Sequence, residues 1–441
     1  MTGLAERGDS EELAAALRRI RGVDISEARL LAHEMRPSHL DGVNSDRGAL
    51  DLSASSARSS KVTEALPGLH LHYRLDVDGF TTALNSALRN EVAGYSLRLN
   101  ERGKRIRAVD WNWAKEPQDT AEGWTTDVRM HVASLSKQIT AIAMTKLLDK
   151  RGIPANAKII DYLPAYWSKG PDVDQITFAN LMTHTSGLDF GVSSSASDFQ
   201  FMKAQIAVGT SHLGQFWYQN MNFGLCRILL ATINGTIPVD FSLPPLFGLT
   251  AFNDIVWDAI TLAAYESYAA AHVFTPSGVS GPTLYHAPTD ALAYNFPVSG
   301  LGWNSGDLTT MAGGAGWHMA VDEVLDVMGA FRRRGTIMSP PKAQAMLDAR
   351  FGIDWMVSTP AGTYYAKNGF WYDSAGQTEQ GVLFYLPHEM EFVLLVNSPV
   401  GTPAQFLYSL VAGAYTSNIV AAHDWGAEPE SLVGVTETQG S

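Results

Sequence analysis

The spacing of hydrophobic and polar residues predicts strands at both ends of the main body and helices between them. Alternating or strongly apolar runs predict five strands, at 94–100, 105–113, 362–371, 381–387 and 390–398. Helical spacing predicts helices at 81–92, 131–152 and 403–420. Gly152 and Pro154 end the second of these helices. This order predicts an α/β (α+β) domain with an antiparallel sheet flanked by helices, in which a mostly helical part is inserted at about 155–290.

The ends of the chain differ from this body. Residues 1–75 are predicted to form an N-terminal extension with two short capped helices and a serine-rich linker at 45–61. The main domain is predicted over 76–425, followed by a C-terminal tail at 426–441.

Composition narrows the classes of protein that fit. Hydrophobic residues make up 46% of the chain and charged residues 17%, which excludes a wholly disordered protein. The single cysteine, Cys226, cannot form an internal disulfide. The formal charge of −13 argues against nucleic acid and membrane surfaces as partners. The N-terminus lacks the pattern of a signal peptide and no span is apolar enough for a membrane, so a cytoplasmic location is expected.

Two Ser-x-x-Lys pairs are candidates for nucleophilic chemistry, because residues at i and i+3 share a helix face. Ser339–Lys342 contains two prolines and opens a polar helix, where serine is an ordinary cap. Ser134–Lys137 opens a long apolar helix that must be buried, which places Lys137 near the core. A buried lysine beside a serine can accept the hydroxyl proton, and the helix N-terminus favours a developing oxyanion.

Metal and cofactor motifs are weak. His70 and His72 share one strand face without a third ligand in reach, and His33-Glu34 lacks the second histidine of a zincin. The sequence contains no Gly-x-Ser-x-Gly elbow, P-loop or Gly-x-Gly-x-x-Gly. We therefore expect no metal and no organic cofactor, only a small-molecule substrate; self-association is left open.

Several further segments carry a family resemblance. HVASLSKQITAIAMTKLLDKRGIPANAKIIDYLP and ITFANLMTHTSGL are followed by Tyr218-Gln219-Asn220, HVFTPSGV, AGGAGWHMAVDEVLDVM and Lys367-Asn368-Gly369. In this order they resemble the serine β-lactamase-like and penicillin-binding-protein superfamily. That group includes class C β-lactamases, D-alanyl-D-alanine carboxypeptidases, D-aminopeptidases and family VIII esterases. The resemblance covers about 80–425.

The resemblance implies a set of site residues. The catalytic residues would be Ser134 as nucleophile, with Lys137 and Tyr218 as its base. The substrate-binding residues would be Asn220, Lys367, Asn368, Gly369 and Phe370. The oxyanion hole would be formed by the backbone N–H groups of Ser134 and Phe370. Three simpler interpretations remain beside these: an aromatic core role for Tyr218, a solvated Lys367, and a structural turn at His184.

Two departures from the family pattern bear on the substrate. Asn368 stands where threonine is usual, and Phe370-Trp371 follows where small residues are common. Both argue against recognition of a β-lactam or a free carboxylate. We therefore expect a serine hydrolase that forms an acyl-enzyme on an ester or amide with an apolar acyl group, most simply an esterase. The alternatives are a D-amino-acid peptidase or amidase, an acyltransferase or peptide cyclase, a β-lactamase, and a non-catalytic binding protein on the same fold.

Overall fold

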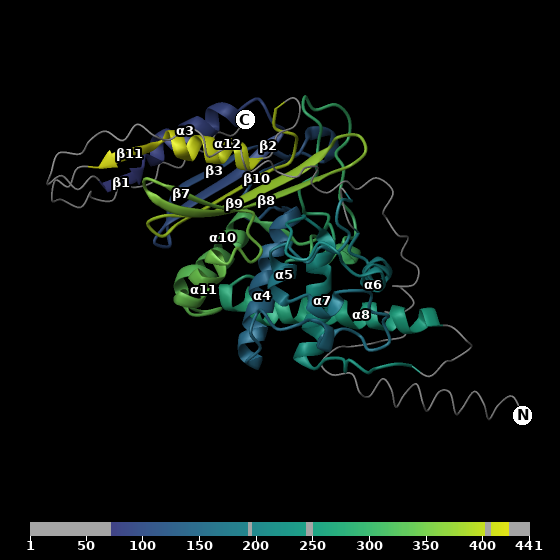
Figure 1. Cartoon of the computed structure of the whole chain (residues 1–441). Helices are drawn as coiled ribbons and strands as arrows, with labels where there is room; N and C mark the ends of the chain where they lie inside the picture. The colour runs from purple at the N-terminus through teal and green to yellow at the C-terminus, as the bar shows by residue number, and fades with distance from the viewer. Residues whose placement is uncertain (1–71, 193–195, 244–249, 402–406, 423–441) are drawn as a thin grey trace, which may run out of the picture.

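Three layers make up the molecule, a sheet with helices on both faces (Figure 1). The structure is a computed structural model that describes residues 72–192, 196–243, 250–401 and 407–422. The two predicted N-terminal helices, the serine-rich linker, His33, His70 and the tail at 426–441 lie outside these residues. Within the described residues, no helix is long and apolar enough to cross a membrane.

The central layer is a seven-stranded antiparallel sheet. Its strands, in spatial order, are β4 (Glu122–Gly123), β3 (Lys104–Lys115), β2 (Gly94–Glu101), β10 (Met390–Val396), β9 (Thr378–Leu386), β8 (Gly362–Tyr372) and β7 (Trp355–Thr359). The C-terminal strands β9 and β10 thus pair with the N-terminal strand β2. Two small sheets are added, β1 (His72–Leu75) with β11 (Ile419–Ala422) and β5 (Arg129–His131) with β6 (His318–Ala320).

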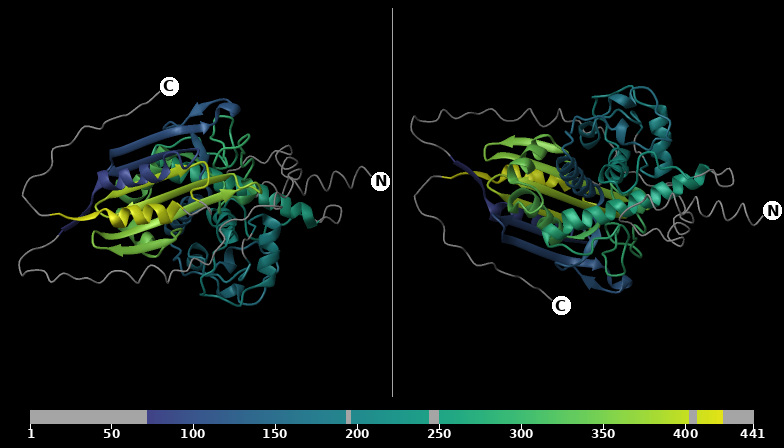
Figure 2. Two further views of the ribbon diagram at one scale, coloured as in Figure 1. Left: turned by 90° about the horizontal axis from the view of Figure 1, so that it is seen from above. Right: turned by 90° about the horizontal axis from the view of Figure 1, so that it is seen from below.

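The outer face of the sheet is covered by α3 (Val77–Leu88) and α12 (Leu407–Ser417), which lie across the strands (Figure 2). Asp76 caps α3 by accepting the N–H of Gly79, so the helix begins four residues before the predicted start. Phe80 is fully buried against Phe392 of β10, with ring centroids 5.2 Å apart. Burial of side chains of this size stabilises the layer by about 2 kcal/mol each.

The other face carries the larger, helical layer. Its central helix is α4 (Ser136–Arg151), buried on every side through its first nine residues. Gly152 ends it in the left-handed conformation, as the sequence predicts. The remaining helices are α5 (Phe178–Met182), α6 (Phe199–Val208), α7 (Asn220–Asn234), α8 (Thr250–Ala269), α9 (Thr275–Ser277), α10 (Val321–Gly329) and α11 (Pro340–Asp348). In Figure 2, seen from below, the long α8 crosses this layer.

The predicted α/β (α+β) class, with its antiparallel sheet and mostly helical middle, is confirmed. Several predicted helix boundaries were wrong. Helix α4 begins at Ser136 rather than at 131, because Arg129–His131 is strand β5. The helix expected at 403–420 ends at Ser417, and Ile419–Ala422 is strand β11. The cause is a distant partner, because β11 pairs with His72–Leu75 in antiparallel register. This strand at 72–75 lies within the predicted N-terminal extension.

Candidate active site

Ser134 lies in a short 3-10 turn, Ala133–Leu135, that leads into α4. The turn is buried and Ser134 is only 3% exposed. Ala133 has a φ of 48°, in the left-handed region that costs a residue with a Cβ about 1 kcal/mol or more. This local strain turns the chain so that Ser134 stands at the beginning of the helix.

Lys137 lies one turn further along and is fully buried. Its ammonium donates to Ser134 Oγ at 2.9 Å, to Asn220 Oδ1 at 2.7 Å and to the carbonyl oxygen of Gly314 at 2.8 Å. All three N–H bonds of a lysine ammonium are thereby matched by acceptors. Such matching is what allows a buried ammonium to exist without a large desolvation penalty.

Tyr218 reaches the same serine from the residues just before α7. Its hydroxyl donates to Ser134 Oγ at 2.8 Å, and Lys367 Nζ donates to the Tyr218 hydroxyl at 3.4 Å. The ammonium groups of Lys137 and Lys367 lie 4.7 and 4.9 Å from the centroid of the Tyr218 ring. The aromatic ring is therefore held between two cations, with its hydroxyl on the serine.

Lys367 is 1% exposed on β8 and has an acidic partner that the sequence analysis missed. Asp354 Oδ1 accepts from Lys367 Nζ at 2.5 Å, and Asp354 Oδ2 accepts the backbone N–H of Asn368 at 3.1 Å. Asp354 stands directly before β7, thirteen residues from Lys367 in sequence. The only sequence signal for it is an acidic residue that precedes a strand next to the one with the lysine.

The Asn368 side chain points away from this cluster. Its Oδ1 accepts the backbone N–H of Tyr408 in α12, which lies on the outer face of the sheet. Alternation along β8 explains this, because neighbouring side chains project from opposite faces. The Asn368 side chain, a sequence-predicted site residue, is therefore not brought to Ser134.

Gly369 and Phe370 continue β8 past the point where β7 ends. Strand β7 pairs with β8 only from Gly362 to Ala366, and the turn around Ser134 lies against the next stretch. A Cβ on Gly369 would come within 2.5 Å of the Val132 carbonyl oxygen and 3.3 Å of the Ser134 nitrogen. Glycine is therefore required for this close approach, which brings the β8 backbone next to the Ser134 amide.

His184 lies under Tyr218 rather than beside the serine. The two rings stack at 4.2 Å, and His184 Nδ1 accepts the backbone N–H of Gln219 at 3.2 Å. Burial, with the nearby charges of Lys367 and Lys137, holds the pKa of His184 well below its usual value. A neutral imidazole that accepts at Nδ1 can therefore hold the backbone next to Tyr218 while its ring packs against the tyrosine ring.

Aromatic side chains gather near Tyr218 in sequence and around His184. Phe190 stacks on His212 at 4.1 Å and contacts Trp217 at 5.0 Å. Phe216 is 51% exposed, and its ring lies 6.1 Å from His184. An apolar surface of this kind next to polar reactive groups is typical of sites for small, partly apolar ligands.

The second Ser-x-x-Lys pair lies elsewhere. Ser339 occupies the N-cap position of α11, with Pro340 in the first turn and no side-chain capping bond. Lys342 is an exposed side chain that pairs with Asp149 of α4. Neither residue belongs to the cluster around Ser134.

An antiparallel sheet with helices on both faces, and a buried Ser-x-x-Lys helix against one strand edge, is the architecture of the β-lactamase and penicillin-binding-protein class of serine hydrolases. The profile of the family described as Beta-lactamase matches residues 83–415. The chain therefore belongs to this family, and the resemblance seen in its sequence is confirmed.

Solved structures share this fold at low sequence identity. FmtA from Staphylococcus aureus is 14% identical with a TM-score of 0.57, over 82% of this chain and 95% of that chain. A β-lactamase/D-alanine carboxypeptidase from Pseudomonas syringae is 15% identical with a TM-score of 0.54, over 73% of this chain and 93% of that one. EstCE1, a hydrolase with promiscuous acyltransferase activity, is 15% identical with a TM-score of 0.52, over 77% and 98%.

Proposed function

We propose that this chain is an esterase that forms an acyl-enzyme on Ser134 and acts on uncharged esters with an apolar acyl part. One observation carries the proposal. Ser134 Oγ accepts hydrogen bonds from Lys137 Nζ at 2.9 Å and from Tyr218 Oη at 2.8 Å, and either group can take the serine proton once it has lost one of its own. A serine at a helix N-terminus with two neighbouring groups that can take its proton has the arrangement that acyl transfer requires.

The reaction divides into two balanced steps. The first step starts with Tyr218 as a phenolate beside the Lys137 ammonium, which is one proton fewer than in the geometry described above. Ser134 Oγ bonds to the carbonyl carbon and gives its proton to the phenolate, the ester C–O bond breaks, and the alcohol leaves with that proton. In the second, water gives a proton to the same phenolate and bonds to the acyl carbon, the bond from that carbon to Ser134 Oγ breaks, and the proton passes to Ser134 as the acid is released. The N–H groups of Ser134 and Phe370 would stabilise the oxyanion in both steps, which the close approach of β8 at Gly369 supports.

The choice of an uncharged substrate rests on the ion pair at Lys367. The lysine that would attract a substrate carboxylate is already paired with Asp354 at 2.5 Å. The Asn368 side chain, which takes the place of the usual threonine, is occupied by Tyr408. Neither group is free to bind an anion, whereas the aromatic surface at Phe190, Phe216 and Trp217 suits an apolar acyl chain.

A substrate comparison tests the choice of ester. We expect kcat/KM for p-nitrophenyl butyrate to exceed that for nitrocefin by about 100-fold or more on one preparation, a difference of about 3 kcal/mol in transition-state stabilisation. A higher value for nitrocefin would instead support a β-lactamase.

A second experiment tests the covalent step. The protein is acid-quenched during butyrate-ester turnover, digested and weighed by mass spectrometry. We expect the butyryl group on the peptide that contains Ser134, in the wild type and in the matched control Ser339→Ala. An adduct on any other residue, or none in a preparation that hydrolyses the ester, would refute Ser134 as the nucleophile. A fluorophosphonate probe that labels nothing would favour a binding protein.

A further inference from the structure

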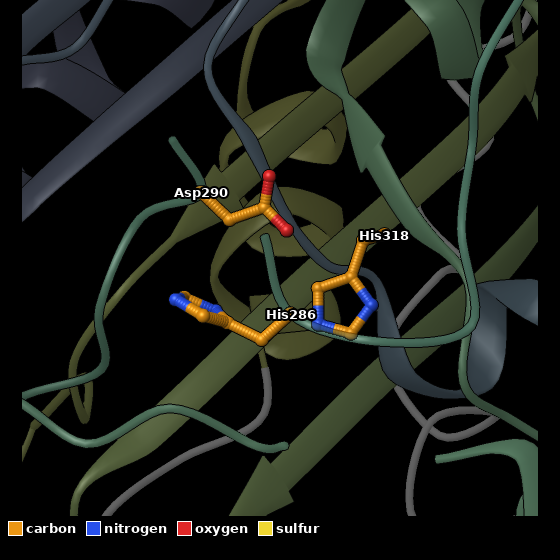
Figure 3. A group of neighbouring side chains, drawn as sticks. All are labelled: His286, Asp290 and His318. Carbon is orange, nitrogen blue, oxygen red and sulfur yellow. The ribbon is translucent and has the colours of Figure 1, made fainter. Parts of the chain in front are cut away.

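A second cluster of chemically active side chains lies in the long connection between α9 and α10. His286, Asp290 and His318 each offer one ligand atom, and these atoms all lie within 4.8 Å of one another. Figure 3 shows the three side chains brought together from two stretches of this connection, with one oxygen of the Asp290 carboxylate directed toward the two imidazoles. Asp290 and His318 are buried and His286 is half-buried.

The tautomer of His318 leaves one ring nitrogen available to a ligand. His318 Nδ1 lies 3.1 Å from the carbonyl oxygen of Gly316, which can only accept, so Nδ1 carries the proton. The lone pair is therefore on Nε2, the nitrogen on the side of His286 in Figure 3. This nitrogen accepts the Ser305 hydroxyl at 3.2 Å, a hydrogen bond that a metal ion would replace. A histidine that donates one ring N–H to a backbone carbonyl and presents the other nitrogen is oriented as metal-binding histidines are.

The other two groups lack the partners that burial normally demands. His286 Nδ1 is buried with no hydrogen-bond partner among the described residues. Asp290 Oδ2 accepts the N–H of Ala287, but no lysine or arginine of the described chain lies within ion-pair distance of this carboxylate. Its two charged neighbours are paired elsewhere, Arg129 with Glu323 and Lys115 with Glu122.

We propose that His286, Asp290 and His318 bind one zinc ion. Two imidazole nitrogens and a carboxylate oxygen are ligands that zinc prefers, and a water beside Ser305 would complete four-fold coordination. Ligand atoms around tetrahedral zinc lie about 3.3 Å apart, so atoms now up to 4.8 Å apart would need to approach by at most about 1.5 Å. The ion would place a positive charge in direct contact with the buried Asp290 carboxylate, which Arg129 and Lys115 influence only from outside ion-pair distance.

The position of the cluster gives the ion a structural role. The connection at 279–317 contains only isolated bridges and one short 3-10 turn, so little regular structure fixes it. The ion would join the loop at 286–290 to β6, which pairs with β5. The same connection carries Gly314, whose carbonyl oxygen accepts from Lys137, and Gly316, whose N–H donates to His131 Nε2. The zinc site is independent of the proposed esterase reaction, since none of its ligands contacts Ser134.

Zinc binding by the whole purified chain tests the inference. The protein is treated with a chelator, dialysed and titrated with zinc chloride by calorimetry, and retained zinc is counted by mass spectrometry. We expect one equivalent of zinc and a rise in Tm of several degrees that the chelator reverses. His286→Ala and Asp290→Asn should each raise the Kd about 100-fold or more and abolish the Tm rise.

A surface histidine supplies the matched control. His388 is exposed in a hairpin turn with a φ of 60°, a conformation that asparagine tolerates, so His388→Asn removes one imidazole without disturbing the cluster. This variant should bind zinc like the wild type. Absence of stoichiometric zinc in the wild type would overturn the inference. Equal zinc affinity in His286→Ala, Asp290→Asn and the wild type would do so as well, because two separate ligands are removed.

Discussion

Two Ser-x-x-Lys segments begin helices in this chain, and their surroundings differ in almost every respect. Ser134–Lys137 lies in the middle of the molecule, between the sheet and α7, with the lysine fully buried. Ser339–Lys342 lies at the exposed start of α11, and its lysine forms a surface ion pair with Asp149. The same residue spacing thus belongs to a buried hydrogen-bonded cluster in one place and to an exposed helix start in the other.

Burial is what separates the two pairs. The ammonium of Lys137 has no water to solvate it and is held by Asn220, Gly314 and Ser134. Lys342 keeps a solvated side chain that is 39% exposed, so its charge requires no fixed partner. A motif therefore gains chemical meaning from the acceptors that the rest of the fold brings to it, and those come from residues 83 and 177 positions away.

The largest expected difference between the two pairs concerns the serines. Ser134→Ala should lower kcat for p-nitrophenyl butyrate by about 10³-fold or more, because no acyl-enzyme can form. Ser339→Ala should keep kcat within about twofold of the wild type. Steady-state kinetics on folded protein, checked by circular dichroism, measures both. A fully active Ser134→Ala variant, or an inactive Ser339→Ala variant, would contradict the assignment of Ser134 rather than Ser339 as the nucleophile.

Replacing the two lysines should also affect the acylation rate unequally, although by less than replacing the serines. Lys137→Ala and Tyr218→Phe should each lower the acylation rate by about 10²–10⁴-fold, the usual contribution of a positioned proton-transfer group. Lys342→Ala is the matched control and should leave the rate unchanged. Single-turnover kinetics with an activated ester isolates this step.

The double variant sharpens the test of a shared network. Lys137 and Tyr218 both contact Ser134 Oγ, so their effects should be far from additive when both are removed. Additive losses would show that the two residues act independently, and would contradict a joint base.

Much of the fold was predictable because its signals are local. The alternation at 94–100 and the apolar spacing from Ile139 to Leu148 directly indicate β2 and α4. The end of α12 was not predictable in this way. Ile419–Ala422 becomes a strand only because His72–Leu75, more than three hundred residues away, supplies its partner.

The residues of the candidate site likewise differ in whether a local sequence pattern reveals them. Ser134 and Lys137 could be found from an i, i+3 pattern, and the family resemblance indicated Tyr218, Asn220 and Lys367. Asp354 could not be found, since nothing local links a residue before β7 to a lysine on β8. The cluster of His286, Asp290 and His318 escaped notice for the same reason, because His318 lies 28 positions beyond Asp290.

A smaller effect, on substrate preference, is expected for Asp354, which neutralises Lys367 beside Tyr218. Asp354→Asn keeps the shape of the side chain but removes its charge, so Lys367 becomes free to attract an anionic substrate. We expect the ratio of kcat/KM for nitrocefin to that for the butyrate ester to rise by about tenfold, the scale of one charge-assisted contact. An unchanged ratio would show that Asp354 does not select against anions. The matched control is Asp149→Asn, which frees Lys342 on the surface and should leave the ratio unaltered.

The smallest effect that we expect is on the free energy of unfolding when Ser339 or Lys342 is replaced. Serine N-caps usually contribute about 1 kcal/mol through a side-chain hydrogen bond, but Ser339 makes no such bond in α11. The ion pair between Lys342 and Asp149 is exposed, and pairs of this kind contribute about 0–1 kcal/mol. Ser339→Ala and Lys342→Ala should therefore each lower the free energy of unfolding by less than about 0.5 kcal/mol in urea denaturation. Lys137→Ala should cost about 2 kcal/mol or more, because Asn220 Oδ1 and the Gly314 carbonyl lose a buried donor. A loss at Lys342 as large as that at Lys137 would mean that burial is not what distinguishes the two pairs.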